Sequence, residues 1–215
     1  MMVSRRLEEG ARLALVITGN GPWECRVLSA VAPKLDGRVL LWFPPPLGRT
    51  GLSVLHEALK VHIDEAYKAR PDIRGRPIYV LILIDKEHFS SPEKSLEELR
   101  ESLVGIEVLG SRVIGGVEGA FRLDCQYGPK LFTAFMAIQG VEKCLNEQLA
   151  ILLKRFYGVE VKADQSQIRN ALRKMGKKIE DVVAERSLGE LEELFPSLIA
   201  ALRALESTLA GSRNS

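Results

Sequence analysis

The arrangement of strands and helices in this chain is decided around one apolar run, Ile78-Tyr79-Val80-Leu81-Ile82-Leu83-Ile84. The run is apolar on both faces, which is typical of a central strand in a parallel sheet. It stops at the polar segment Asp85-Lys86-Glu87-His88. We therefore predict a buried strand whose carboxyl end carries charged side chains.

Strand and helix patterns alternate on both sides of this run. Strands are predicted at 12–18, 38–43, 78–84, 106–109, 112–117 and 120–124, and helices at 22–32, 51–69 and 91–103. Alternating βαβ units take right-handed crossovers, which place helices on both faces of a mostly parallel sheet. The sequence thus predicts an α/β, Rossmann-like ligand-binding domain over residues 1–145.

The end of the chain is predicted to be helical. An apolar pattern of helical period spans 129–156, and two or three further helices follow it, including Leu188 to Leu209. Residues 146–215 are therefore expected to form an all-helical C-terminal appendage.

Composition narrows the possible classes of protein. The 215 residues carry a formal net charge of +2, which gives no global electrostatic argument for nucleic acid. Cys25, Cys125 and Cys144 are too widely spaced to indicate a disulfide framework or a zinc site. No apolar run approaches the roughly 20 residues needed to cross a membrane. We expect a cytoplasmic protein with no membrane association, no metal and no cofactor.

Four segments directly follow predicted strands. They are Thr18-Gly19-Asn20, Pro44–Gly48, Asp85–His88 and Cys125–Lys130. Ligands in open α/β sheets bind beyond the carboxyl ends of the strands. We therefore expect these segments to gather at one rim of the sheet, and that rim is the predicted binding site.

The segment from Leu123 to Thr133, LDCQYGPKLFT, is predicted to contain a strand, a glycine turn and a helix start. Such an arrangement leaves backbone N–H groups unpaired, and these form a seat for an anion. Lys130 would lie in the first helical turn, where the helix dipole disfavours a cation. A phosphate opposite Lys130 would explain this position, and a solvated turn lysine is the alternative.

A second glycine-bearing turn follows the first predicted strand. Thr18-Gly19-Asn20-Gly21-Pro22-Trp23-Glu24 leads into a helix, with Pro22 and Glu24 as ordinary helix-start residues. The glycines that flank Asn20 allow positive φ and a close approach of the backbone to a ligand. The spacing differs from the dinucleotide fingerprint G-x-G-x-x-G, because no glycine occupies the third place.

Three segments resemble motifs of the CRISPR-associated Rossmann-fold (CARF) proteins. Val16 to Glu24, VITGNGPWE, is similar to the first-strand motif, in which a glycine and a tryptophan bracket a phosphate-binding turn. Leu83-Ile84-Asp85 resembles the central strand of that family, and Leu123 to Lys130 resembles its second motif. The likeness covers about residues 10–145. It departs from the family where Gln126 replaces the usual threonine and where Pro129 removes a backbone donor.

The resemblance implies a homodimer that binds a cyclic oligoadenylate second messenger across its two-fold axis, in type III CRISPR antiviral signalling. Some members of the family also cleave the messenger as metal-independent ring nucleases, by attack of a ribose 2′-hydroxyl that leaves a 2′,3′-cyclic phosphate. The catalytic residues would then be Lys130, which stabilises the charged transition state, and Thr18. The ligand-binding residues implied are Gly19, Asn20, Gly21, Trp23, Asp85, Gln126, Tyr127 and Gly128.

A second function is suggested by the charges near the C-terminus. Residues 154–178 hold eight Lys or Arg against two acids, and residues 179–206 hold seven acids against two arginines. The two blocks are either solvated faces that pair with each other, or the basic segment 162–178, with the helix Gln165–Lys174, binds nucleic acid. In the latter case the chain is a ligand-responsive DNA-binding regulator.

A third function is a Toprim-like metal-dependent nuclease. Asp85, Glu87 and Glu118 suggest an acidic cluster for Mg²⁺. The Toprim class also needs a glutamate at the end of its first strand, where this chain has Thr18. His56 and His62 have poor metal-ligand spacing, and we interpret both as packing residues.

Overall fold

The strand β4 (Ile78–Asp85) lies at the centre of the sheet in the computed structural model, which describes residues 1–6, 12–18, 22–35, 39–44, 51–73 and 75–211. Within these ranges the sheet has seven strands in the order β1-β3-β2-β4-β7-β6-β5. The other strands are β1 (Met2–Ser4), β2 (Arg12–Thr18), β3 (Val39–Trp42), β5 (Glu107–Val113), β6 (Ala120–Tyr127) and β7 (Lys130–Gln139).

The sheet has a parallel part and an antiparallel part. Parallel ladders join β1 to β3, β3 to β2, β2 to β4 and β4 to β7. Antiparallel ladders join β7 to β6 and β6 to the edge strand β5. The predicted α/β class with a mostly parallel sheet is confirmed.

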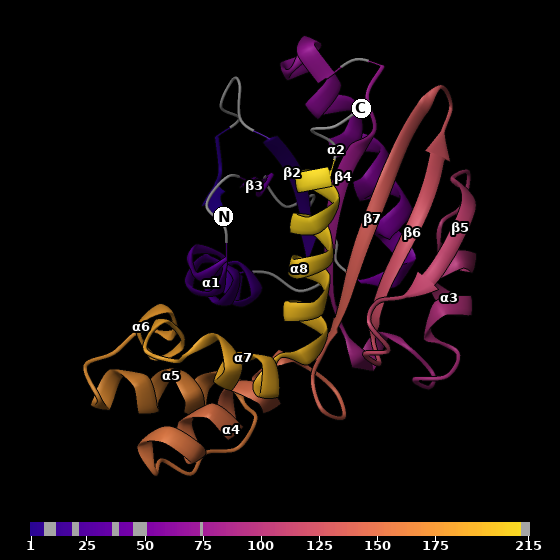
Figure 1. The fold of residues 1–215 in the computed structure, drawn as a ribbon. Helices are drawn as coiled ribbons and strands as arrows, with labels where there is room; N and C mark the ends of the chain where they lie inside the picture. Colours follow the sequence, from indigo (N-terminus) through magenta and orange to yellow (C-terminus); the bar gives the residue numbers. More distant parts are fainter. Residues whose placement is uncertain (7–11, 19–21, 36–38, 45–50, 74, 212–215) are drawn as a thin grey trace.

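Helices cover both faces of the sheet (Figure 1). One face packs against α2 (Leu55–Ala69) and α3 (Ser95–Ser102), and the other packs against α1 (Pro22–Val31) and α8 (Pro196–Gly211). Four further helices gather at one end of the molecule: α4 (Leu145–Tyr157), α5 (Gln165–Lys174), α6 (Ile179–Ala184) and α7 (Leu188–Leu194). Short 3₁₀ turns are η1 (Ala32–Lys34), η2 (Leu52–Val54), η3 (Pro71–Ile73) and η4 (Lys86–His88).

β7 occupies the first part of the helix that the sequence predicts at 129–156, so that prediction is wrong. Alternate side chains of β7 enter two different core clusters, with Phe132, Ala134, Met136 and Ile138 toward α2 and α3, and Phe135 and Ala137 toward α8. A strand buried on both faces is apolar throughout and shows no alternation, so its pattern imitates that of a buried helix. The strands predicted at 106–109 and 112–117 are likewise a single strand, β5.

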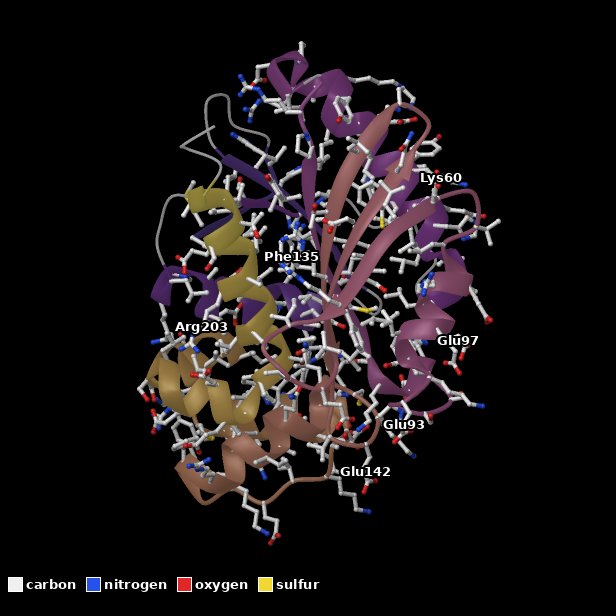
Figure 2. The ribbon with its side chains drawn as sticks, turned by 45° about the vertical axis from the view of Figure 1, so that its right-hand side comes forward. Lys60, Glu93, Glu97, Phe135, Glu142 and Arg203 are labelled. Atoms are coloured by element: carbon white, nitrogen blue, oxygen red, sulfur yellow. The ribbon has the colours of Figure 1, made fainter. Side chains whose placement is uncertain are left out.

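The C-terminal helix α8 packs across the sheet, mainly over β7 (Figure 1). Its inner face carries Leu198, Leu202, Leu205 and Leu209, which are all buried. Ser197 at its start donates a hydrogen bond of 2.5 Å from Oγ to the carbonyl oxygen of Ile138 at the end of β7. Figure 2 shows Phe135 in the interior, between α8 and the strands. The hydrophobic cluster under α8 continues into α4–α7, so the sheet and the predicted appendage share one core.

Truncating a leucine of α8 should destabilise the sheet as well as the helix. We expect Leu205→Ala, at a fully buried position, to lower the free energy of unfolding by about 2–5 kcal/mol. Urea denaturation followed by far-UV circular dichroism and by the fluorescence of Trp23 and Trp42 should give coincident transitions.

The matched control is Leu131→Ala, because Leu131 is 48% exposed at the start of β7 and should cost less than about 1 kcal/mol. Two separate transitions, or equal costs for the two variants, would contradict a shared core.

Candidate functional site

The connections of the sheet reverse direction between β2 and β4. From β2 the chain passes through α1 on one face to β3, and from β3 it returns through α2 on the other face to β4. In α/β sheets the crevice outside the carboxyl ends of two such strands is where ligands bind. Thr18 ends β2 and pairs in register with Leu83, two residues before Asp85 ends β4. The structure thus brings Thr18 and Asp85 to the same place, as the sequence predicts.

Two buried carboxyl groups lie at this junction. Glu24 in the first turn of α1 and Asp85 at the end of β4 are each 5% exposed. Burial raises the pKa of Glu24 to about 7, a hydrogen bond from backbone N–H opposes the shift, and the negative charge of Asp85 adds to it. Glu24 therefore binds and releases a proton near neutral pH, as a general acid or base must.

Asp85 also connects the sheet to the C-terminal helices. Its Oδ1 accepts a hydrogen bond of 3.1 Å from the backbone N–H of Leu145, the first residue of α4. The carboxylate thereby satisfies one of the unpaired N–H groups of a helix start. A change in the charge or position of the Asp85 carboxylate would therefore alter the hydrogen bond that holds the start of α4.

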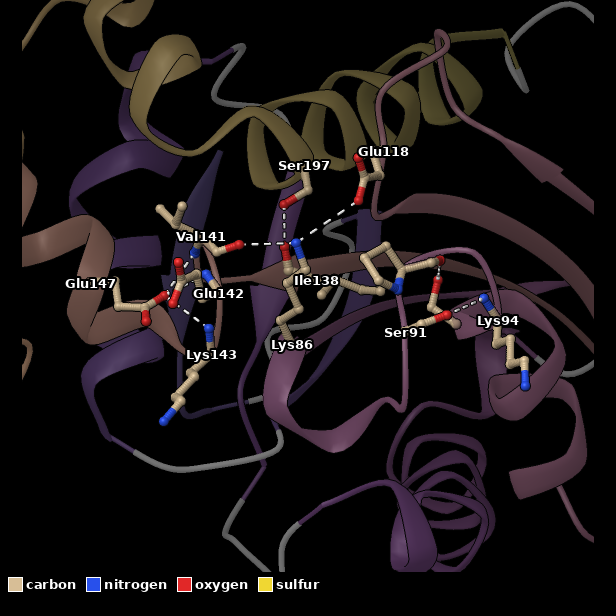
Figure 3. A network of polar contacts seen from close by, with 12 residues as sticks. Lys86, Ser91, Lys94, Glu118, Ile138, Val141, Glu142, Lys143, Glu147 and Ser197 are labelled. Atoms are coloured by element: carbon tan, nitrogen blue, oxygen red, sulfur yellow. Dashed lines mark hydrogen bonds and ion pairs between the residues drawn. The ribbon is translucent and has the colours of Figure 1, made fainter.

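The segment between β7 and α4 is held against the end of β4 (Figure 3). Lys86 donates from Nζ to the carbonyl oxygen of Val141 at 2.9 Å, and the N–H of Glu87 donates to the carbonyl oxygen of Lys143 at 2.8 Å. The carboxylate of Glu147 accepts from the N–H groups of residues 141, 142 and 143 at 2.8–2.9 Å. Burial opposes ionisation of Glu147, but these backbone donors outweigh it together and lower its pKa. This rim is therefore preorganised by hydrogen bonds.

Lys130 lies at the other end of the sheet, and its predicted convergence with Thr18 is wrong. Thr18 is level with Leu83, which is level with Ala137 on β7, seven residues beyond Lys130. At roughly 3.3 Å per residue that places the two ends about 23 Å apart. Lys130 starts a strand and not a helix, because Gly128 and Pro129 form the two-residue turn of a hairpin between β6 and β7. Gly128 has a φ of 56°, and glycine at the first central position is typical of a type II′ turn.

Lys130 is engaged by neighbours within the chain. It forms an ion pair with Asp64 of α2 and lies over the rings of Tyr67 and Tyr127, at 5.8 and 5.1 Å from their centroids. Gln126 donates from its side chain to the carbonyl oxygen of Gly128 at 2.9 Å. The predicted site residues Gln126, Tyr127, Gly128 and Lys130 thus form a hairpin end anchored to α2, away from Thr18 and Asp85.

Other predicted site residues have different outcomes. Gly19, Asn20 and Gly21 lie outside the described residues. Trp23 lies in the first turn of α1, is 6% exposed and packs in the core cluster on that face of the sheet. The sequence does not single out Glu24 as a site residue, because an acid in a first helical turn is an ordinary helix-start signal and only the folded structure shows that this one is buried.

The described part of the chain contains no group of three or more His, Cys, Asp or Glu side chains that could hold a metal ion. Glu118 pairs with Lys86 at 3.9 Å, and Asp85 accepts from Leu145. The acidic cluster that a Toprim-like site requires is therefore not assembled among these residues. A hollow of about 50 Å³ lies beside Lys86, Phe89 and Ile138. It is well below the roughly 300 Å³ of small-molecule sites, and hollows of about 350–490 Å³ lie instead beside the edge strand β5.

Comparison with protein-family models, with curated proteins and with solved structures finds no match to this chain. Along the described ranges, none of the helices combines the length and the apolar character needed to cross a bilayer.

Replacing Glu24 should change how stability depends on pH. The pKa of the folded Glu24 carboxyl is about 7, against an ordinary value of 4.5 for a glutamate in water, so the stability of the native protein falls as pH rises through this window. From pH 4 to pH 8, wild type should lose up to about 3 kcal/mol relative to Glu24→Gln. The measurement is the free energy of unfolding in urea at a series of pH values.

Glu97→Gln is the control, because Glu97 lies exposed on α3 (Figure 2). The assignment fails if Glu24→Gln and wild type follow the same pH curve.

Proposed function

We propose that this chain binds an adenine-nucleotide messenger of the cyclic oligoadenylate type at the junction of β2 and β4. The observation that supports the proposal most directly is the meeting of Thr18, the start of α1 and Asp85 where the connections of the sheet reverse. The resemblance of Val16–Glu24 and Leu83–Asp85 to CARF motifs concerns these same segments.

The groups at this junction suit different parts of a nucleotide. The N–H group of Trp23 in the first turn of α1 and the hydroxyl of Thr18 are donors for phosphate oxygens. The Asp85 carboxylate accepts hydrogen bonds, as acidic residues at such crevices do from ribose hydroxyls. A protonated Glu24 reduces the negative charge that an incoming phosphate meets. Binding of the ligand therefore needs no metal ion in this proposal.

The proposal covers binding and assigns no residue to cleavage of the ring. Lys130 is the catalytic cation that the resemblance implies. It lies at the start of β7, at the end of the strands remote from Thr18, and pairs with Asp64. A cyclic ligand with internal symmetry fits a two-fold axis, so the proposal includes a homodimer. Light scattering with and without ligand measures this directly.

Ligand binding should depend on Asp85 and Thr18 and not on Lys130. Calorimetric titration with a panel of cyclic oligoadenylates of different ring size, in EDTA, should give saturable binding to wild type. Asp85→Asn keeps the shape and can still accept from the Leu145 N–H, and we expect it to weaken binding about tenfold or more. Loss of a hydrogen bond to a charged group costs roughly 1.5–3 kcal/mol. Thr18→Val should weaken binding by a smaller factor.

Lys130→Ala is the matched control, with a dissociation constant within about twofold of wild type. Circular dichroism and thermal melting confirm that each variant is folded. The proposal is refuted if no ring binds, or if Lys130→Ala loses as much affinity as Asp85→Asn.

A further inference from the structure

The helix α5 presents a continuous polar surface to solvent. Its exposed residues are Gln165, Ser166, Gln167, Arg169, Asn170, Arg173 and Lys174, and only Ile168, Ala171 and Leu172 are buried. We call the exposed set the α5 face. It contains cations, amides and one serine and no acid, and Figure 1 shows α5 beside α4, α6 and α7 at the helical end of the molecule.

The cations of the α5 face have no counter-charge among the described residues. None of Arg169, Arg173 and Lys174 takes part in an ion pair in those ranges. Exposed cations on the neighbouring helices are compensated, since Lys154 pairs with Glu160 at 2.6 Å and Arg155 with Glu193 at 2.6 Å. The cations at this end of the molecule that lack an ion pair in those ranges therefore lie on α5 and just beside it, at Lys162 and Lys178.

The acidic residues of 179–206 do not neutralise the α5 face. Glu180 pairs with Arg26, Glu185 with Lys177, Glu192 with Arg203, and Glu193 with Arg155. The two charge blocks thus pair with each other only in part, and the cations left over in the described ranges are those of α5 together with Lys162 and Lys178, which flank it. The cations of the α5 face are exposed to water, so the fold does not require an acid beside them. Their positive charge is therefore available to an anionic partner.

We propose that α5 docks into the major groove of duplex DNA. The groove admits an α-helix, and Arg, Gln, Asn and Ser are the side chains that hydrogen-bond to base edges there. The three cations lie in the later turns and can contact phosphates, which supply most of the affinity of non-specific binding. Gln165, Ser166 and Gln167 lie at the beginning of the helix, the part of a recognition helix that meets the bases.

The start of α5 is held rigidly for this role. Asp164 caps the helix by accepting from the N–H groups of Ser166 and Gln167, both at 3.0 Å. The buried side of α5 is anchored on α4. Duplex RNA is a poorer partner, because its major groove is too deep and narrow for side chains to read. The inference stands without the proposed ligand at the β2–β4 junction.

The test is fluorescence anisotropy of a labelled duplex DNA of mixed sequence, titrated with the full-length protein between about 50 and 200 mM salt. Arg169→Ala/Arg173→Ala/Lys174→Ala should bind at least about tenfold more weakly. Its slope of log affinity against log salt should be smaller by about 2–3, since each phosphate contact contributes about 0.9. All three residues are exposed, so thermal melting should match wild type.

The control is Lys154→Ala/Arg155→Ala/Arg203→Ala, which removes the same charge from cations that are already paired. It should keep the salt slope of wild type. Three results would overturn the inference: no binding of duplex DNA at about 50 mM salt, an equal effect of both triple variants, or tighter binding of duplex or single-stranded RNA than of DNA.

Discussion

The structure depends on the burial of β7 on both faces and along both edges. β7 pairs with β4 on one side and with β6 on the other, and it is the point where the sheet changes from parallel to antiparallel. One face of β7 belongs to the core under α2 and α3, and the other face belongs to the core under α8. Because α8 comes from the end of the chain, the core closes only when sheet and C-terminal helices assemble together.

The same strand positions the candidate site. β7 ends beside β4, and the segment that leaves it is tied to Lys86 and Glu87 before α4 begins. The N–H of Leu145 then reaches the buried carboxylate of Asp85. Glu24 in the first turn of α1 and Asp85 at the end of β4 are both buried here, and burial raises the pKa of Glu24. Asp85 thus belongs both to the candidate site and to the contact that holds the start of α4.

Ion pairs between the C-terminal helices neutralise only part of their charge. Three of the five cations of 154–178 outside α5 pair with an acid, namely Lys154, Arg155 and Lys177. The sequence alone does not show which cations lack a counter-charge, because ion pairs join residues that are far apart along the chain, such as Arg155 and Glu193.

The sequence by itself determined the α/β class, the central position of Ile78–Asp85, and the meeting of Thr18 with Asp85. These follow from local apolar runs and from the rule that parallel strands share a carboxyl edge. Tertiary structure alone decided that 130–139 is a strand, that Lys130 lies at the far edge, and that Glu24 is buried. The physical reason is that burial on both faces removes the alternation that distinguishes a strand from a helix, and that the burial of a carboxyl group is set by the elements that pack over it.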